Sequence, residues 1–258
     1  MLLAMDIGNS QSVLGLFDGS VLLHDWRVAT EPKRTCDELA ILVINLLKLA
    51  GYERGQVTAI AVASVVPRLN REYQDMSLRH FKVEPLLIGP GVKTGMPILT
   101  SNPREVGADL IVDGVAAYET YGGPCVVVDF GTATTFSAVS AKGEYLGTAI
   151  APGIEISTDA LSSHAAKLSR VELVDPGTVI GKSTPQSMQA GAVYGFAGQV
   201  DGIVRRMREE LGGEAVSVAT GGLSPLIFEH ARTLDHLDVH LTLRGLEIIY
   251  RRSQEGRA

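Results

Sequence analysis

Two aspartates, Asp6 and Asp129, stand where an apolar run gives way to a glycine-containing turn. The first turn reads Asp-Ile-Gly-Asn-Ser and the second Asp-Phe-Gly-Thr-Ala-Thr-Thr. The backbone N–H groups of such turns, with the neutral hydroxyl and amide groups that follow the glycine, suit phosphate oxygens. A carboxylate at the strand end can hold a cation or orient a water bound to it. Each turn therefore has the composition of a metal and phosphate site.

For a single copy of this motif a structural role is the better explanation, because Asp and Gly are ordinary turn residues and Asp-x-Gly can simply close a hairpin. Two copies in matching positions favour function, since folding alone gives no reason to repeat the same carboxylate. The leading interpretation is a pair of facing turns with a nucleotide between them.

The elements around the two turns also repeat, as strand, turn, strand and turn. Strands in a meander, followed by strands that alternate with helices, indicate α/β sheets with helices on their faces. We expect two such domains from an internal duplication, at residues 1–121 and 122–258. The pattern predicts strands at 2–7, 12–17, 21–28, 57–66, 86–89, 125–129, 136–139 and 216–220, and helices at 35–51, 67–81, 109–118, 186–211 and from 241.

Composition limits the other classes of function. A chain of 258 residues with 45% hydrophobic content can bury one large core or two ordinary ones. The formal net charge of −6 argues against nucleic acid as a partner. Cys36 and Cys125 form neither a zinc pattern nor a disulfide framework, and no apolar run is long enough for a membrane span, so we expect a cytoplasmic protein.

Two further motifs, at residues 177–183 and at Asp109, each allow a functional and a structural interpretation. The run Gly-Thr-Val-Ile-Gly-Lys-Ser at residues 177–183 is similar to a phosphate-binding loop, but it has one residue too few between its glycines and no clear strand before it, so we reject it as a nucleotide loop. Asp109 stands at a predicted helix start, where capping is the simple explanation and a general base is the functional one.

A series of motifs resembles the type III pantothenate kinases, of the acetate and sugar kinase/actin-like superfamily with two ribonuclease H-like domains. The matching segments cover almost the whole chain, and their order and spacing are more specific than any one of them. They are Asp6–Ser10, 89–95, Asn102–Asp109, Asp129–Thr135, Pro152–Ile154, Gly181–Thr184 and Thr220–Leu223.

The resemblance implies ATP-dependent phosphorylation of pantothenate to 4'-phosphopantothenate, the first step of coenzyme A biosynthesis, by a homodimer with Mg²⁺ and a monovalent cation, K⁺ or NH₄⁺. It implies Asp109 as general base, Asp6 near Mg²⁺ and Asp129 as ligand of the monovalent cation. The implied ATP contacts are Asp6, Ile7, Gly8, Asn9, Ser10, Gln11, Ser12, Val13 and Thr132, and the implied pantothenate contacts are Gly107, Ala108, Asp109, Leu110 and Thr184.

One position departs from the family pattern, because Leu110 stands where the family has an Arg, and Asp113 stands where Asn is common. The missing guanidinium would pair with the substrate carboxylate, a contact worth about 1.5–3 kcal/mol. Three alternatives stay open: another basic residue such as Arg104 substitutes, the kinase takes a different acceptor such as a sugar or acetate, or the protein is a catalytically weakened or non-catalytic nucleotide-binding paralogue.

Overall fold

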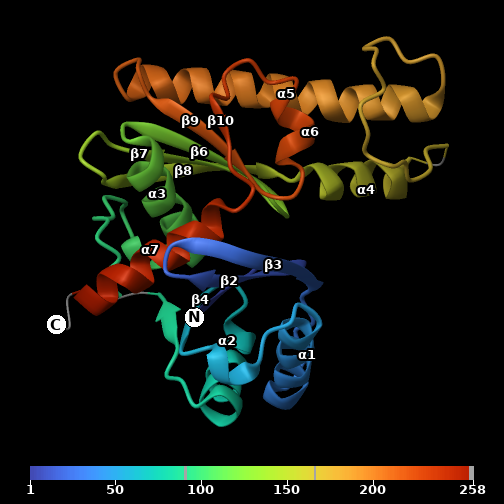
Figure 1. Cartoon of the computed structure of the whole chain (residues 1–258). Helices are drawn as coiled ribbons and strands as arrows, with labels where there is room; N and C mark the ends of the chain where they lie inside the picture. Colours follow the sequence, from blue (N-terminus) through green and yellow to red (C-terminus); the bar gives the residue numbers. More distant parts are fainter. Residues whose placement is uncertain (90–91, 166, 256–258) are drawn as a thin grey trace. The chain divides into compact units, whose positions relative to one another are not determined.

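The structure is a computed structural model that describes residues 1–89, 92–165 and 167–255, and the chain in it divides into two compact units (Figure 1). Unit 1 comprises Met1–Met96, Ser101–Ala116 and Leu241–Ala258, and unit 2 comprises Pro97–Thr100 and Ala117–His240. The units differ from the expected division after residue 121, chiefly because the C-terminal helix belongs to unit 1.

Each unit is built on a five-stranded mixed sheet, and the two sheets have the same topology. In each, a central strand pairs antiparallel with the next strand of the chain and parallel with a later one. This match confirms the expected α/β class and internal duplication. In spatial order the strands are β3 (Val21–Ala29), β2 (Gln11–Asp18), β1 (Leu2–Ile7), β4 (Ala59–Ser64) and β5 (Leu86–Ile88) in unit 1, and β8 (Tyr145–Pro152), β7 (Ala133–Val139), β6 (Cys125–Phe130), β9 (Val216–Thr220) and β10 (His236–Leu237) in unit 2.

Two helices cover one face of the unit 1 sheet, α1 (Cys36–Leu49) and α2 (Pro67–Met76). The predicted capping box is present at the start of α1, where Thr35 and Glu38 satisfy each other's backbone N–H groups. The predicted helix at 67–81 changes character after α2 and ends as a π-helical turn, Ser77–Phe81. Alternation along β1 directs Leu3, Met5 and Ile7 into the core beneath these helices.

The C-terminal helix α7 (Leu241–Glu255) covers the opposite face of the same sheet, packing on β1, β2 and β4 (Figure 1). Small residues make room for it, because Gly15, Ala4 and Ala61 are register partners in a row across three strands. A Cβ at Gly15 would lie 2.8 Å from Leu243 Cδ1. This close approach explains why α7 belongs with the N-terminal sheet.

Helix α3 (Ala108–Tyr121) starts in unit 1 and packs closely against α7. A Cβ at Gly245 of α7 would overlap the carbonyl oxygen of Val112, so the two backbones nearly touch. A short 3₁₀ helix, Pro103–Glu105, precedes α3, and another, Arg54–Gln56, precedes β4.

In unit 2 the strand face with Val126, Val128 and Phe130 packs against the long helix α5 (Thr184–Glu210). Two shorter helices complete the unit, α4 (Ile154–His164) and α6 (Ser224–Phe228). The sequence pattern did not predict α4, α6, β8 or β10. Among the described residues, no helix combines the length and hydrophobicity that a bilayer span requires.

Candidate active site

The first aspartate turn joins β1 to β2 and is a tight hairpin. Ile7 and Ser12 are register partners, and the Gly8 N–H donates to the carbonyl of Gln11 at 3.1 Å. A Cβ at Gly8 would lie only 2.8 Å from that same oxygen, which explains the glycine. Asn9, Ser10 and Gln11 are exposed at the tip, where polar groups can meet a ligand.

Ser12 lies in a different place from the other polar residues of this turn. Its side chain is buried, its hydroxyl is 2.7 Å from Thr30 Oγ1, and it hydrogen-bonds the hydroxyl of Tyr73. The Thr30 N–H also donates to the carbonyl of Ser10 at 3.0 Å. These groups form a buried hydroxyl network that supports the turn from below.

Asp6 precedes the turn on the face of the sheet opposite the α1 and α2 core, since side chains alternate along β1. Its register partner on the parallel strand β4 is Ala63, and the Val65 N–H donates to Ile7 O at 3.0 Å just beyond. The carboxyl ends of parallel strands are the usual place for ligands in α/β sheets. Asp6 is therefore at the edge of the sheet where a ligand is expected.

Asp109 lies in the first turn of α3, and its surroundings fit both a cap and a base. The helix begins with the bond from Ile111 N to Gly107 O, at 3.3 Å. Asp109 Oδ1 accepts the Leu110 N–H at 2.8 Å. A Cβ at Gly107 would overlap this same Oδ1, so the glycine leaves space for the carboxylate.

Burial sets the protonation of Asp109. Desolvation raises the pKa of its carboxyl above the ordinary value, and hydrogen bonds from the N–H groups of Leu110 and of Asp109 itself act in the opposite direction. A carboxylate with a raised pKa is a better proton acceptor, which suits general-base chemistry.

Leu110 directs its side chain into the protein, where it is 8% exposed. The position that carries an Arg in the family pattern therefore holds a buried apolar group here. Arg104, on the 3₁₀ helix before α3, is exposed. Asp113 is 2% exposed and lies one turn further along α3.

The second aspartate turn joins β6 to β7, and here the backbone of a nearby glycine packs against the carboxylate of Asp129. Gly131 N–H donates to Ala133 O at 3.1 Å, and Gly153 N–H donates to Thr132 O at 3.1 Å. Gly221, with φ +92°, leaves no room for a Cβ, which would overlap Asp129 Oδ1 and lie 2.7 Å from Phe130 N. Thr132 is exposed at the tip.

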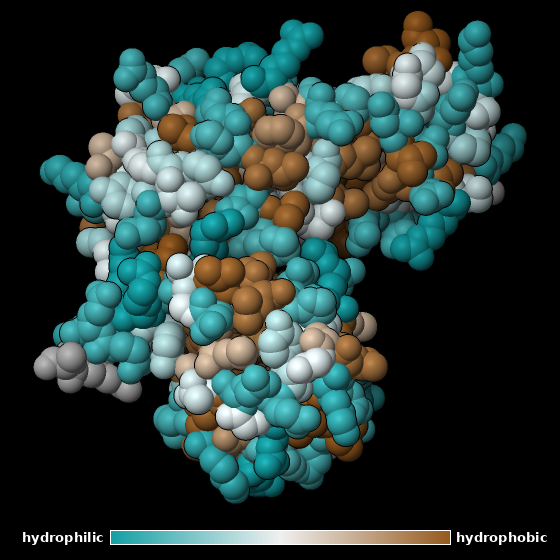
Figure 2. All heavy atoms as spheres, viewed as in Figure 1, coloured by the Kyte–Doolittle hydropathy of each residue, from teal (hydrophilic) through white to brown (hydrophobic). Residues whose placement is uncertain are grey.

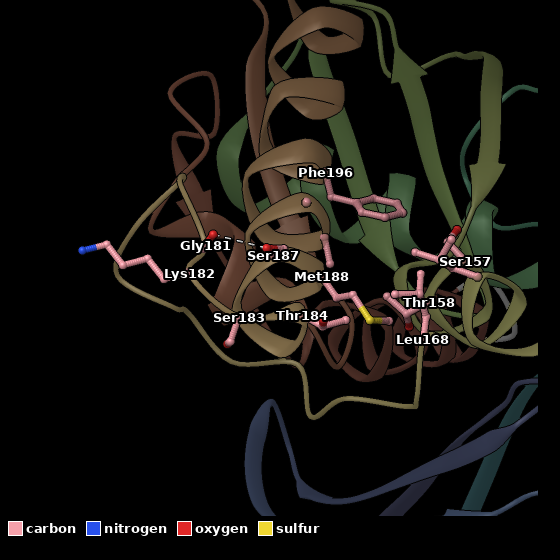
Figure 3. A pocket seen from close by; sticks show the side chains of 13 residues that line it. Ser157, Thr158, Leu168, Gly181, Lys182, Ser183, Thr184, Ser187, Met188 and Phe196 are labelled. Atoms are coloured by element: carbon pink, nitrogen blue, oxygen red, sulfur yellow. Dashed lines mark hydrogen bonds between the residues drawn. The ribbon is translucent and has the colours of Figure 1, made fainter. Parts of the chain in front are cut away.

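Thr184, the first residue of α5, lines a cavity of about 780 Å³ within unit 2, between α4 and α5. Figure 3 shows Thr184, Met188, Leu168 and Thr158 gathered around the cavity, while the Lys182 side chain points away from it. The segment before Lys182 contains no strand, in agreement with the rejection of a phosphate-binding loop.

The donor chemistry of both turns fits hard cations. No cluster of three or more His, Cys, Asp or Glu side chains that could hold a metal ion occurs in the described part of the chain. Mg²⁺ in phosphate-transfer enzymes needs no such cage, because one or two carboxylates, waters and the substrate phosphates complete its shell. The lack of such a cluster is therefore compatible with a Mg²⁺ site that uses a single carboxylate.

Comparison with known proteins assigns the family. Residues 2–206 match the profile of the family described as type III pantothenate kinase. The chain belongs to this family. Proteins named type III pantothenate kinase from Moorella thermoacetica and Myxococcus xanthus are 55% and 56% identical to it; each match covers 98% of this chain, with 100% of the first relative and 99% of the second.

A distant structural likeness supports the fold. The structure of a proposed 2-dehydro-3-deoxygalactonokinase from Sinorhizobium meliloti matches with a TM-score of 0.60 at 13% identity, covering 98% of this chain and 96% of that one. The sugar-kinase and actin-like fold with duplicated ribonuclease H-like halves is thereby confirmed, as is the family resemblance expected from the motifs.

The structure adds residues around the type III pantothenate kinase motifs that the sequence did not indicate. Thr30 and Tyr73 support the first turn from distant elements. Gly153 and Gly221 pack against the second turn, and both had a signal in the sequence, since they lie in the Pro152–Ile154 and Thr220–Leu223 motifs.

Proposed function

We propose that this protein transfers the terminal phosphoryl group of ATP to the primary hydroxyl of pantothenate, forming 4'-phosphopantothenate for coenzyme A biosynthesis. The observation that carries the proposal is the partly buried carboxylate of Asp109 at the start of α3, in a chain of the type III pantothenate kinase family. ATP use follows from the kinase family.

Asp109 is the proposed general base. Its carboxylate would accept the proton of the acceptor hydroxyl as that oxygen attacks phosphorus. The N–H groups at the start of α3 hold the carboxylate in one orientation, and Gly107 keeps its space clear. Partial burial leaves the base less solvated than it would be on the surface, which strengthens its interaction with the hydroxyl.

The first turn is the proposed ATP-phosphate site of unit 1. Gly8, Asn9, Ser10 and Gln11 are the tip residues proposed to meet the phosphates, and the carboxylate of Asp6 would orient waters on Mg²⁺. Mg²⁺ when bound neutralises charge on the phosphates. Ile7, Ser12 and Val13 act by shaping this turn, since they pair in the strands on either side of it.

The second turn is proposed to serve the same reaction from unit 2. Thr132 is a proposed ATP contact, and Asp129 is the proposed ligand of K⁺ or NH₄⁺. Support comes from Gly131, where a Cβ would lie 3.4 Å from Asp129 Oδ2 and 3.6 Å from Ala133 O, so that a carbonyl oxygen comes close to the carboxylate. Oxygen ligands with few formal charges suit a hard cation.

Gly107, Ala108, Leu110 and Thr184 are the proposed pantothenate contacts besides Asp109. Because Leu110 has no charge, we assign the substrate carboxylate to Arg104, which is exposed five residues before Asp109. Leu110→Arg tests this. We expect little change in the KM for pantothenate. A fall in this KM of about tenfold or more would instead show that the missing guanidinium at position 110 limits binding.

A homodimer is also proposed, and its support is an apolar surface on unit 2. Figure 2 shows hydrophobic residues gathered around α4 and the start of α5. Light scattering would test the assembly, and a monomer at micromolar concentration would contradict it. The cytoplasmic location stays a prediction. The exposed apolar residues on α4 and in the segment before α5 include Ile156, Leu161, Val179 and Ile180.

The deciding experiment is a coupled assay of ADP release with pantothenate, Mg²⁺, ATP and K⁺. We expect turnover that requires pantothenate, and no turnover above the Asp109→Asn background would overturn the proposal. The alternative of a weakened or non-catalytic paralogue is favoured by Leu110 and Asp113 and predicts little or no turnover. Calorimetric titration of pantothenate in the presence of an ATP analogue would separate it from an active kinase. Parallel assays with sugars and acetate test a different acceptor.

A further inference from the structure

A long segment without helix or strand, from Leu168 to Ser183, joins α4 to α5. Connections of this length inside a compact unit are uncommon and usually functional. The segment is fastened to its neighbours at several points: Arg170 pairs with Asp159 of α4 at 3.0 Å, and Gln189 of α5 donates to Glu172 O at 2.9 Å. It therefore follows a defined path.

The most polar fastening point is a cluster of Asp175, Tyr194 and His230, here named the Asp175 anchor. Asp175 Oδ1 accepts the Tyr194 hydroxyl at 2.8 Å and the Gly177 N–H at 2.9 Å. These hydrogen bonds lower the pKa of Asp175, first through Gly177 and then through Tyr194. The pairing with Asp175 raises the pKa of the Tyr194 hydroxyl.

His230 completes the anchor from the residues after α6. Its ring lies edge-on to Tyr194, with centroids 5.1 Å apart, and its Nε2 is 3.4 Å from Asp175 Oδ2. That buried nitrogen has no hydrogen-bond partner among the described residues. The anchor thus joins the segment, α5 and the chain after α6 at one place.

The far end of the segment forms one wall of the unit 2 cavity. Gly181 packs so closely on α5 that a Cβ would lie 2.5 Å from Ser187 N, and Lys182 N–H donates to Gln186 Oε1 at 3.1 Å. Gly181, Lys182, Ser183 and Thr184 all line the cavity (Figure 3).

The Asp175 anchor restricts the conformations of the chain that forms this wall of the cavity. Tyr194 lies ten residues after Thr184 on α5, or about 15 Å along a helix axis. The nine residues from Asp175 to Thr184 could reach about 30 Å when extended, so the chain is longer than the distance it covers. Without the anchor, residues 176–180 would have room to move away from α5, and only the contacts of Gly181, Lys182 and Ser183 would hold the end of the segment there.

We propose that the Asp175 anchor positions the acceptor-binding end of the cavity, with Asp175, Tyr194 and His230 as positioning residues for Thr184 and the residues before it. The inference rests on the proposed function in one respect, the contact of Thr184 with pantothenate. The anchor touches no reacting atom, so its loss weakens acceptor binding and leaves the chemical step intact.

Tyr194→Phe is the first test, because it removes only the hydroxyl. The expected result is a rise of about three- to tenfold in the KM for pantothenate, with kcat and the KM for ATP within twofold of wild type. Tyr118→Phe is the matched control: Tyr118 is also half-buried in unit 2, and its hydroxyl donates to Ala141 O at 3.4 Å. Its kinetic constants should not change.

The second test compares two substitutions of Asp175. Asp175→Asn keeps an oxygen for Tyr194 and Gly177 and should be nearly as active as wild type, whereas Asp175→Ala should match or exceed the effect of Tyr194→Phe. Limited proteolysis should cut residues 168–183 faster in Asp175→Ala than in Asp175→Asn. An unchanged KM for pantothenate in an active Asp175→Ala enzyme would overturn the positioning role of the anchor and leave the proposed function standing. A wild type without pantothenate turnover overturns the proposed function and this inference together.

Discussion

The turns after β1 and β6 occupy the same position in two sheets of identical topology, yet they present Asp6 and Asp129 in different settings. The first turn has exposed polar side chains at its tip and a buried hydroxyl network beneath. In the second, glycine backbone lies directly against the carboxylate. Duplication supplied the position of the carboxylate twice, and the differences in its neighbours underlie the proposal of a phosphate site at one turn and a cation site at the other.

Helices α3 and α7, which follow the last strand of each sheet along the chain, also begin near carboxylates in different settings. At the start of α3, Asp109 accepts an N–H of its own helix turn. Before α7, Asp238 Oδ1 accepts the His240 N–H at 3.1 Å, and Asp238 Oδ2 is 3.4 Å from the Tyr121 hydroxyl. Both carboxylates serve their helix starts, but the family motif surrounds only Asp109.

The largest expected effect separates these two helix starts. Asp109→Asn should lower kcat by about 10²- to 10⁴-fold, because the base is lost. Asp238→Asn should change kcat by less than about threefold and cost about 1 kcal/mol of stability, as for a weakened cap. Steady-state kinetics and chemical denaturation of both variants measure this, and equal losses of kcat would remove the distinction.

The protonation of Asp109 gives this comparison a pH dependence. Because burial raises its pKa, the acidic limb of kcat/KM should lie above the ordinary pKa of an aspartic acid, with activity falling as pH falls through that value. For stability the sign is opposite to that of a salt-bridged Asp: ionised Asp109 costs folding free energy above its folded pKa. Asp109→Asn should therefore be at least as stable as wild type at pH 7, with the difference shrinking at acid pH.

The second prediction concerns the backbone around Asp129. Gly221→Ala should destabilise the protein by about 3 kcal/mol, because a left-handed φ and an overlap with the carboxylate add together. Gly213 is the matched control, with φ +103° and nothing within 4 Å of its Cβ position, so Gly213→Ala should cost only about 1 kcal/mol. Urea denaturation measures both, and equal costs would show that the close contact is unimportant.

A smaller effect should divide the roles of the two carboxylates. Asp129→Asn should raise the K⁺ concentration for half-maximal activity by about tenfold, since a cation loses a charged ligand. Asp6→Asn should instead raise the KM for MgATP and leave the K⁺ dependence unchanged. Titrations of activity against each cation provide the measurement, and an exchange of the two phenotypes would reverse the assignment.

The smallest effect belongs to the support beneath the first turn. Tyr73→Phe removes the hydroxyl that bonds Ser12 and should cost about 1 kcal/mol of stability. The KM for ATP should rise by no more than about threefold, because the tip residues remain. Thermal denaturation and ATP titration test this. A loss of kcat as large as that of Asp109→Asn would place Tyr73 in the chemistry itself.

Local signals in the sequence were enough for much of the fold and for both turns. The capping box at Thr35, the apolar strands and the repeated Asp-x-Gly motif each extend over a few residues. They can therefore be recognised without knowledge of the tertiary structure. The helix α4 escaped prediction because its sequence, Ile-Glu-Ile-Ser-Thr-Asp-Ala-Leu-Ser-Ser-His, is polar and partly β-branched.

Features built from distant residues could not be predicted. The contact of Tyr194 with Asp175 and the packing of Gly221 on Asp129 depend on elements brought together only by folding. Ser12 was grouped with the exposed polar residues of its turn, but alternation in β2 and the hydroxyl of Thr30 bury it. The place of α7 in unit 1 could not be predicted for the same reason, because Gly15 lies against Leu243 across more than two hundred residues of chain.

The row formed by Gly15, Ala4 and Ala61 has a consequence for biosynthesis. The ribosome makes the N-terminal sheet first, but the helix that covers its second face only after the whole of unit 2. That face therefore stays uncovered until Leu241–Glu255 has left the exit tunnel, so unit 1 completes its folding after unit 2 has been made. Nascent chains paused before residue 241 would expose Leu2 and Phe17 to chaperones.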